Sequence, residues 1–274
     1  MVRSLWSAAT GMIAQQTNID TISNNLANVN TTGYKTEVAN FKTLLYQTLQ
    51  TQTTTANGDP KPVGAQVGLG VRNSSISSIF KQGSFRDSES DTDFAINGKG
   101  LFAVTGDDGE TYYTRNGNFY LSTNDSGGLT LCTSDGYAVQ DIRGRDITFN
   151  RNYTASNLTV GEDGEFYYPD GDNNPQPLGI QIGLFQFNNP TGLEKLGSSY
   201  YKATDASGDA INEARSTNLE KSTIVQGYLE SSNVQVVDEM VNMIVIARAY
   251  EAGQKVIQTE DSTLDKAVNS VGRV

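Results

Sequence analysis

Paired carboxylates are the first residues in this sequence that could perform chemistry. Asp107 and Asp108 are adjacent, and Asp91 and Asp93 are two residues apart. Two neighbouring carboxyl groups can serve as the acid and the base of glycoside hydrolysis. Both pairs stand in sequence typical of turns, which favours acids that are solvated in loops. They leave a carbohydrate-active or carbohydrate-binding module open as a remote alternative.

Three pairs of adjacent tyrosines could stack against sugar rings: Tyr112-Tyr113, Tyr167-Tyr168 and Tyr200-Tyr201. Adjacent residues on a β-strand point to opposite faces, so a pair cannot present both rings to one ligand. Half-buried aromatic residues of strands are therefore the favoured interpretation.

The sequence lacks residues that common nucleophilic catalytic sites, metal sites and phosphate-binding loops need. The sequence has no histidine, and Cys132 is its one thiol, so no Ser–His or Cys–His pair and no cysteine-based zinc site can form. The stretch from Asp170 resembles the start of a calcium loop, but Pro175 and Gln181 stand where Gly and Glu are needed. Residues 64–70 lack the lysine of a phosphate-binding loop. We predict no catalytic residue, no cofactor and no metal site, hence no enzyme.

The charge balance and hydropathy exclude further classes. Among 274 residues, 20 are basic and 31 acidic, giving a net charge of −11. Such a chain is repelled by phosphate backbones, which argues against nucleic-acid binding. No stretch approaches the roughly 18 apolar residues of a membrane helix. Polar residues interrupt the N-terminus too early for a secretory signal, so we expect no cleaved signal peptide.

The N-terminal region predicts a long helix from Ser4 to about Val29. Ser4 is a plausible N-cap, and the turn residues of 30–33 predict the end. Apolar residues recur every seven positions, with Ala9, Gln16 and Ser23 filling the second seam position. The apolar seam residues are Leu5, Met12, Ile19 and Leu26. The asparagines near its end indicate either a frayed terminus or an amide network at a packed interface.

The C-terminal region repeats this pattern over about 36 residues, roughly 54 Å of helix. The first seam position holds Val236, Met243, Tyr250, Ile257, Leu264 and Val271, and the second holds Met240, Ala247, Gln254, Asp261 and Val268. A helix this long would overhang a small β-domain, which disfavours simple packing of amphipathic helices on that domain. The two seams are expected to pair with each other or with other copies, and to become ordered as copies pack together.

The region between the helices reads as strands. Residues 48–73 are rich in Thr, Gln and Gly and predict an extended or loop segment. From Phe94 onward, turn signals recur about every ten residues, as in an all-β sandwich or barrel. The candidate strands are 94–96, 101–104, 111–114, 118–121, 129–132, 137–139, 147–149, 158–160, 165–168 and 180–187.

Both ends of the chain resemble one protein family. Residues 4–35, with NNLANVNTTGYK at their centre, look like the N-terminal signature of bacterial flagellar rod and hook proteins. Residues 226–257 resemble the matching C-terminal signature, and 97–104 and 113–119 resemble the strand motifs that open the β-domain. The SLW start, AQQTN and LLYQT are closer to distal-rod members than to proximal-rod or hook members, which stay open as alternatives. The signature residues are Asn24, Asn25, Leu26, Ala27, Asn28, Gly33, Tyr34 and Lys35.

The resemblance implies an α+β fold with paired terminal helices, a mainly extended connector and an inserted all-β outer domain. Residues 1–45 and 224–274 would form the helical inner-tube domain (D0). Residues 46–96 and 197–223 would form the connecting domain (Dc), and residues 97–196 the outer domain (D1). Many copies would stack helically into a hollow, rigid shaft that transmits torque from motor to hook.

The resemblance also implies partners and a location. Proximal-rod and hook subunits would adjoin the tube, and envelope rings could surround it. The chain would pass through the flagellar type III export apparatus and function outside the cytoplasmic membrane, in the basal body. Phe41 and Leu45 resemble the segment that such subunits present to the export gate.

Overall fold

A computed structural model of the chain describes residues 2–50, 64–124, 127–151, 153–170, 174–216 and 219–271. They fall into two compact units. Unit 1 comprises residues 1–27, 37–77 and 235–274, and unit 2 comprises residues 28–36 and 78–234. Along the sequence, a helix near each end flanks a mostly β middle region, so the predicted α+β class is confirmed.

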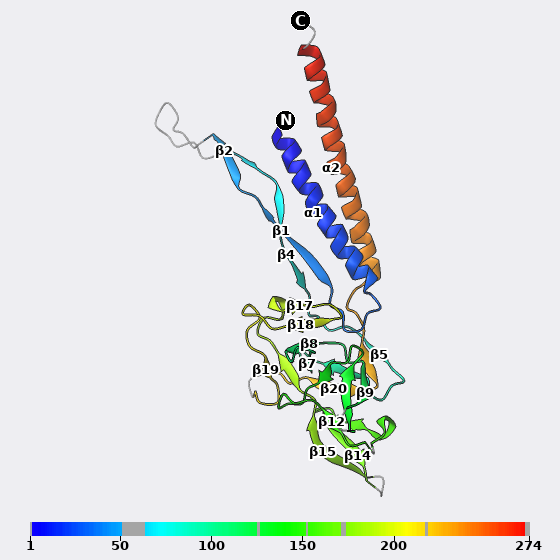
Figure 1. Cartoon of the computed structure of the whole chain (residues 1–274). Coiled ribbons are helices and arrows are strands. Elements are labelled where there is room, and N and C mark those ends of the chain that lie inside the picture. Colours follow the sequence, from blue (N-terminus) through cyan, green and yellow to red (C-terminus); the bar gives the residue numbers. More distant parts are fainter. Residues whose placement is uncertain are drawn as a thin grey trace. The chain divides into compact units, whose positions relative to one another are not determined.

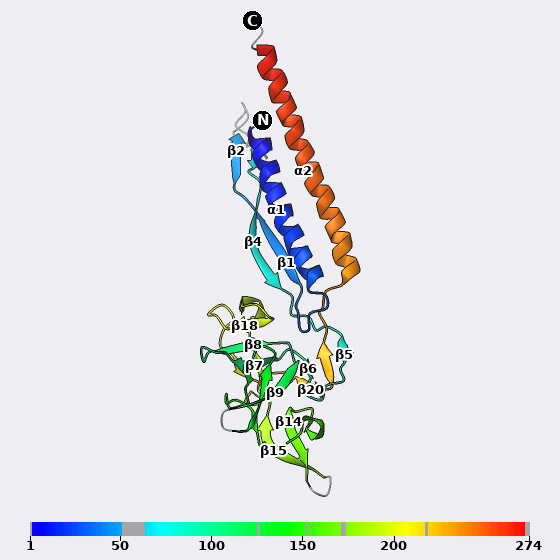
Figure 2. The same ribbon diagram turned by 45° about the vertical axis from the view of Figure 1, so that its right-hand side comes forward.

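Unit 1 is built on two antiparallel helices, α1 (Val2–Ala27) and α2 (Val236–Val271), which lie side by side (Figures 1 and 2). The Ser4 hydroxyl donates to Glu260 Oε1 at 2.7 Å. A Cβ added at Gly253 would lie 2.9 Å from Met12 Cγ, so the glycine lets the helices approach closely. With 36 residues against 26, α2 extends past the N-terminus of α1.

The limits of α1 differ from the prediction at both ends. The helix begins before Ser4, so Ser4 bonds α2 instead of capping its own helix. It ends at Ala27, and Thr31 then donates its amide to the Asn28 carbonyl in a turn. Gly33, expected at the helix end, lies beyond that turn with a φ of 69°, a left-handed conformation that suits glycine.

A two-stranded ribbon completes unit 1. β1 (Glu37–Thr43) pairs with β4 (Val71–Ser78), and β2 (Tyr46–Gln50) pairs with β3 (Ala65–Gly68). The ribbon follows α1 in both views (Figures 1 and 2), where Asn73 donates to the Thr17 hydroxyl at 2.7 Å. The described parts of the predicted segment 48–73 are thus mainly strand; residues 51–63 lie outside the described residues.

Unit 2 consists of strands joined by turns and two short 3-10 helices, Ala155–Asn157 and Pro190–Gly192. Its strands are β5 (Phe85–Asp87), β6 (Phe94–Asn97), β7 (Leu101–Thr105), β8 (Thr111–Thr114), β9 (Phe119–Thr123), β10 (Leu129–Thr133), β11 (Ala138–Val139), β12 (Thr148–Phe149), β13 (Thr159–Val160), β14 (Glu165–Pro169), β15 (Pro175–Gln181), β16 (Leu184–Gln186), β17 (Glu194–Lys195), β18 (Tyr200–Lys202), β19 (Ile211–Asn212), β20 (Thr223–Gln226) and β21 (Tyr228–Glu230).

The largest sheet of unit 2 has ten strands and the central order β12-β10-β11-β7-β8-β18-β17. β9 adds to β10, β16 adds to β7, and β19 adds to β16. A three-stranded sheet, β13-β14-β15, and the pairs β20-β6 and β21-β5 complete the unit. The predicted strand 180–187 is in fact two strands, because Gly183 passes the Asp141 carbonyl too closely for a side chain.

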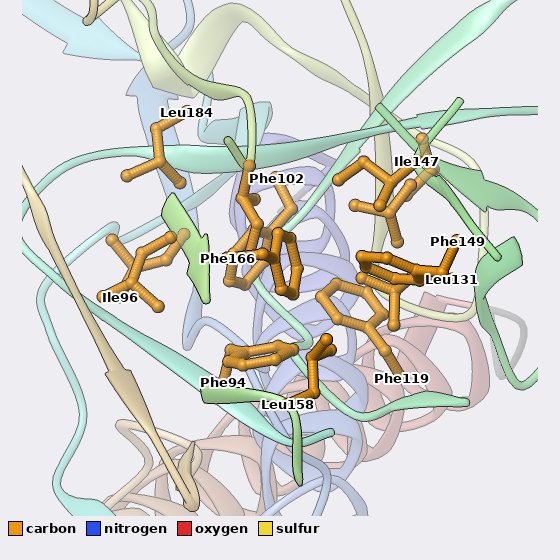
Figure 3. Packing of buried hydrophobic residues seen from close by; sticks show 14 of the residues in the cluster. Phe94, Ile96, Phe102, Phe119, Leu131, Ile147, Phe149, Leu158, Phe166 and Leu184 are labelled. Atoms are coloured by element: carbon orange, nitrogen blue, oxygen red, sulfur yellow. The ribbon is translucent and has the colours of Figure 1, made fainter. Parts of the chain in front are cut away.

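A phenylalanine-rich core holds unit 2 together. Phe94, Phe102, Phe119 and Phe166 are fully buried, and their side chains gather with Leu131 and Ile147 (Figure 3). Phe102 and Phe119 meet edge to face, with ring centroids 5.1 Å apart. This geometry is favoured by aromatic quadrupoles and adds to the gain from burial.

The two units do not follow the predicted division into three domains. Residues 78–96 and 197–223, predicted as connector, lie in unit 2. There β6 pairs with β20, and β18 pairs with β8. The division into D0, Dc and D1 stays a prediction about the assembled protein.

Candidate assembly surface

The groups considered for catalysis are occupied by structural contacts. Asp93, predicted to be a solvated loop acid, is buried: its carboxylate accepts from Ser88 at 2.5 Å and from Asn118 at 3.1 Å. Asp107 is exposed, while Asp108 accepts the Tyr112 hydroxyl at 2.6 Å. That bond raises the pKa of Tyr112 to about 12.

The described residues also offer no metal centre. They contain no group of three or more His, Cys, Asp or Glu side chains that could hold an ion. Part of the calcium-like stretch, residues 171–173, lies outside the described residues. Cys132 is buried, and burial raises the pKa of its thiol, which disfavours the reactive thiolate.

Two of the tyrosine pairs alternate between faces as strand geometry requires. Tyr113 and Tyr201 pack in a smaller cluster with Leu101. Tyr112 and Tyr200 pack against the main core instead. Neither of these two pairs presents both rings to one ligand.

The two units differ in the solvent exposure of their large hydrophobic side chains. Among the described residues, unit 1 buries only four hydrophobic side chains: Ala14, Ile22, Ala39 and Ile246. It exposes sixteen large ones: Trp6, Ile13, Val38, Phe41, Leu45, Tyr46, Leu49, Ile76, Val236, Val237, Met240, Val241, Ile244, Val245, Val256 and Val268. Over its described residues, unit 2 exposes only five large hydrophobic side chains, Ile79, Phe85, Tyr120, Leu196 and Tyr228, while it buries a hydrophobic core. Large contiguous apolar patches on a protein surface are typical of interaction sites.

The predicted seam residues lie at different places in unit 1. Nine of them are partly buried: Leu5, Met12, Ile19, Leu26, Met243, Ala247, Tyr250, Ile257 and Leu264. Val236 is 38% exposed and Met240 is 52% exposed. Gln254 and Asp261 are also exposed, and Val268 is 69% exposed, so these five are less buried than those nine.

The second row of the intrachain contact lies one residue earlier on α2 than predicted. Ile246 is only 8% exposed, Gly253 meets Met12, and Glu260 meets Ser4. These three residues are themselves seven apart, so the heptad spacing was a usable signal. The prediction missed them because a glycine and a glutamate do not look like seam residues.

The first third of α2 carries an exposed apolar face, formed by Val237, Met240, Val241, Ile244 and Val245. These side chains are 52–72% exposed. At about 100° per residue, Val237 and Ile244 lie roughly 160–180° around the helix from Ile246. This part of α2 is therefore apolar on the side facing α1 and on the opposite side. A helix that is apolar all round is normally buried.

The signature residues after α1 fix the chain locally. The buried Asn25 side chain donates to the Glu37 carbonyl and accepts from the Glu37 amide, both at 2.9 Å, tying α1 to β1. Asn24 and Ala27 are exposed, while Asn28 and Tyr34 are partly buried. Asn25 is therefore fixed by two bonds within the chain and is not part of a frayed end, whereas an amide network at a packed interface stays a prediction.

Lys35 belongs to a group that the sequence did not predict. Its ammonium lies 2.6 Å from Glu230 Oε1, and Arg115 Nε lies 2.5 Å from Glu230 Oε2. All three side chains are at most 4% exposed. We call Lys35, Arg115 and Glu230 the ionic hub. Burial, chiefly, and the nearby Arg115 charge lower the pKa of Lys35, against the opposing effect of Glu230.

The residues proposed for the export gate are accessible. Phe41 is 38% exposed on β1, and Leu45 is 84% exposed between β1 and β2.

Comparison with known proteins places this arrangement in a family. Residues 5–35 match the family described as flagella basal body rod protein, 95–168 the flagellar hook protein FlgE/F/G D1 domain, and 225–270 the flagellar basal body rod FlgEFG protein C-terminal region. The flagellar basal-body rod protein FlgG of Borreliella burgdorferi is 42% identical over 98% of this chain and 98% of its own. The chain belongs to the FlgG family.

Other FlgG proteins show the same relationship. That of Caulobacter vibrioides is 41% identical over 96% of this chain and 97% of its own, and that of Bacillus subtilis 36% over 98% and 99%. A crystal structure of Helicobacter pylori flagellar hook protein FlgE2 aligns with 66% of this chain and 48% of its own, at 13% identity. Its TM-score of 0.23 is too low to support an argument about fold.

Membership of the FlgG family makes the chain a structural subunit of the flagellar distal rod and not an enzyme. Neither α1 nor α2, over its described residues, is long and apolar enough to cross a membrane.

Proposed function

We propose that the chain polymerises helically into a hollow, rigid tube through the exposed faces of unit 1. The tube carries torque to the hook and conducts exported subunits. The terminal helices form its inner wall, the D0 domain, and the β-rich outer domain stands outside it. Proximal-rod and hook subunits adjoin its ends, and envelope rings surround it.

The contrast between the units carries this proposal. Unit 2 buries its phenylalanine core, while unit 1 leaves Trp6, Ile13 and the apolar face of α2 in contact with water. Full burial of one large apolar side chain is worth about 1.5–3 kcal/mol. A second copy that covered the five residues of this face would therefore supply a substantial part of the association energy.

The two helices also present different surfaces, which suits a filament. α1 exposes Trp6 and Ile13, seven residues apart, whereas α2 exposes Val237 and Ile244. When two different patches meet, the contact is heterologous, and repetition gives either a ring or an open helical assembly. The seam residues Val236 and Met240, exposed in one chain, would then pack between copies.

Export and ordering belong to the same proposal. Accessible Phe41 and Leu45 present the export-gate segment to the type III apparatus, and the subunit functions beyond the cytoplasmic membrane. The helical arms become fully ordered as neighbours cover them. Full helix content in a dilute monomer, measured by far-UV circular dichroism, would count against this last step.

The experiment that tests the proposal replaces Ile244, which is 62% exposed, by Asp. Ile244→Asp adds a charge to the apolar face without touching the intrachain contact, so unit 2 should stay folded while rod assembly and motility are lost. Gln258→Asp, at an exposed polar position of α2, is the matched control and should assemble. Leu26→Asp should also block assembly through the seam. Normal swimming of Ile244→Asp cells would overturn the proposal.

Electron microscopy of basal bodies separates this assignment from the related positions. A distal-rod subunit, labelled in the assembled structure, lies between the proximal rod and the hook. A label confined to the proximal rod or to the hook would replace the distal-rod assignment with one of those.

A further inference from the structure

Each charged side chain of the ionic hub in unit 2 makes further hydrogen bonds besides the two ion pairs. Lys35 Nζ also donates to the Lys81 carbonyl at 2.9 Å, and Glu230 Oε1 also accepts from the Gly83 amide at 2.8 Å. The Arg115 guanidinium donates to the carbonyls of Gly98 at 2.7 Å, Ile96 at 3.1 Å and Gly100. Two cations and one anion thus occupy a buried site in which backbone oxygens accept further hydrogen bonds from both cations.

A second set of bonds, centred on Asn233, lies beside the hub. Asn233 Oδ1 accepts from the Thr36 amide at 2.7 Å, and Nδ2 donates to the carbonyls of Ile79 at 2.9 Å and Lys81 at 3.0 Å. The Ile79 amide in turn donates to the Thr36 carbonyl at 2.8 Å. One asparagine therefore holds two other backbone segments together.

The hub and Asn233 join the same three segments, 33–36, 79–84 and 230–233. The Gly33 amide donates to the Glu230 carbonyl at 2.8 Å, and the Ser231 amide donates to the Ser84 carbonyl at 2.9 Å. These segments end or begin where the chain passes between the units, at residues 36–37, 77–78 and 234–235. Unit 2 thus fixes three of its four connections to unit 1 against one another.

The hub also ties together parts of the chain that are distant in sequence. Lys35 lies 195 residues before Glu230, and Arg115 lies 115 residues before it. Each residue falls in a different one of the three regions that match flagellar families. No local element could hold these segments in register.

We propose that the ionic hub and Asn233 form a load-transfer junction of the rod subunit. This inference rests on the proposed function. A single peptide connection can twist about its own φ and ψ angles. Three connections that are bound side by side cannot twist independently unless the buried charges separate. Separation is strongly unfavourable, because it leaves a buried charge without its partner. Torque would therefore enter unit 2 through three chain segments at once.

The test uses Glu230→Gln in the full chain, with cells swimming in dilute medium and in medium thickened with methylcellulose. The variant keeps the side-chain shape but leaves two buried cations without their anion. We expect rods to assemble in purified basal bodies, swimming to persist in dilute medium, and swimming to fail in viscous medium. Amide exchange should accelerate at Thr36 and Gly83 but not at Phe102 in the core.

A core variant separates load transfer from simple loss of stability. Leu131→Ala or Ile147→Val, whichever matches the loss of thermal stability in Glu230→Gln, should swim normally in both media. Asn233→Ala, which removes backbone bonds without changing charge, should reproduce the viscous-medium defect. If Glu230→Gln does not fold, Asn233→Ala alone decides.

Several results would overturn the junction. These are equal swimming of the hub and core variants in viscous medium, or failure of hub variants to assemble while the core variant assembles. Each leaves the proposed function intact, because that function is tested separately by Ile244→Asp.

Discussion

The charge balance of the ionic hub leads to a prediction in which two partners of one ion pair behave differently. The native site holds Lys35, Arg115 and Glu230, a net charge of +1, with each side chain almost fully buried. Glu230→Leu raises the buried charge to +2. Lys35→Met leaves the neutral pair of Arg115 and Glu230. The acidic residue should therefore matter far more than the lysine.

The magnitudes follow from the contacts. Removing one partner of a buried ion pair costs about 3–5 kcal/mol, and Glu230→Leu also leaves the Gly83 amide unbonded, for about 1–3 kcal/mol. Lys35→Met removes the burial penalty that lowers the pKa of Lys35. The Lys81 carbonyl keeps its bond from Asn233. We expect Lys35→Met to cost about 0–2 kcal/mol.

The assay is urea denaturation of the full chain, followed by near-UV circular dichroism of the tyrosine-rich unit 2. With a slope of about 2 kcal/mol/M, the urea midpoint of Glu230→Leu should fall by roughly 2–4 M and that of Lys35→Met by less than about 1 M. Adding Lys35→Met to Glu230→Leu should raise stability, because it removes one of two unneutralised cations. Equal losses for the two single variants, or no rescue in the double variant, would refute the argument from charge balance.

Other perturbations give simpler outcomes. The pKa of Lys35 is lowered from 10.5 in the folded state, so between that lowered value and 10.5 the unfolded chain binds more protons than the folded one. Raising the pH through this window should therefore stabilise the native chain relative to Lys35→Met. Urea midpoints of the two proteins check this, and parallel pH profiles would contradict it. Asp108→Asn should lower the pKa of Tyr112 from about 12 toward 10, since the Asp108 carboxylate holds the phenol protonated; an unchanged NMR titration of Tyr112 would show that the bond is not the cause. Gly117→Ala would place a Cβ 1.7 Å from the Phe94 carbonyl and should cost about 3 kcal/mol or more. Gly109→Ala meets no atom within 4 Å and should cost only about 1–2 kcal/mol for its positive φ, as thermal unfolding can show.

Features set by neighbours along the chain could be predicted from the sequence. The sevenfold spacing predicted a C-terminal helix of about 36 residues, and α2 has 36. Turn residues between apolar runs located most strands of the main sheet, such as 111–114 and 129–132. Both signals are local, because helical periodicity and turn conformations depend on a few consecutive residues.

Features set by distant partners could not be predicted. Lys35, Arg115 and Glu230 look like ordinary surface charges in the sequence, since nothing local marks a residue that is paired across 195 positions. Asp93 was assigned to solvent for the same reason, although Ser88 and Asn118 enclose it. The ribbon strands β2 and β3 were only described as extended, because a strand without a buried face shows no alternation of apolar and polar residues.

The folding of the two units should therefore depend differently on protein concentration. The hydrophobic core of unit 2 is formed by its own residues, so the unfolding of unit 2 should be independent of protein concentration. Unit 1 buries few large side chains of its own and exposes the apolar face of α2. Partners that bind only the folded form stabilise it by mass action. The order of α1 and α2 should thus rise with concentration, and with incorporation into the rod, while the β-sheet signal stays constant. In the proposed tube, the contacts that assemble the subunits would then also supply its rigidity.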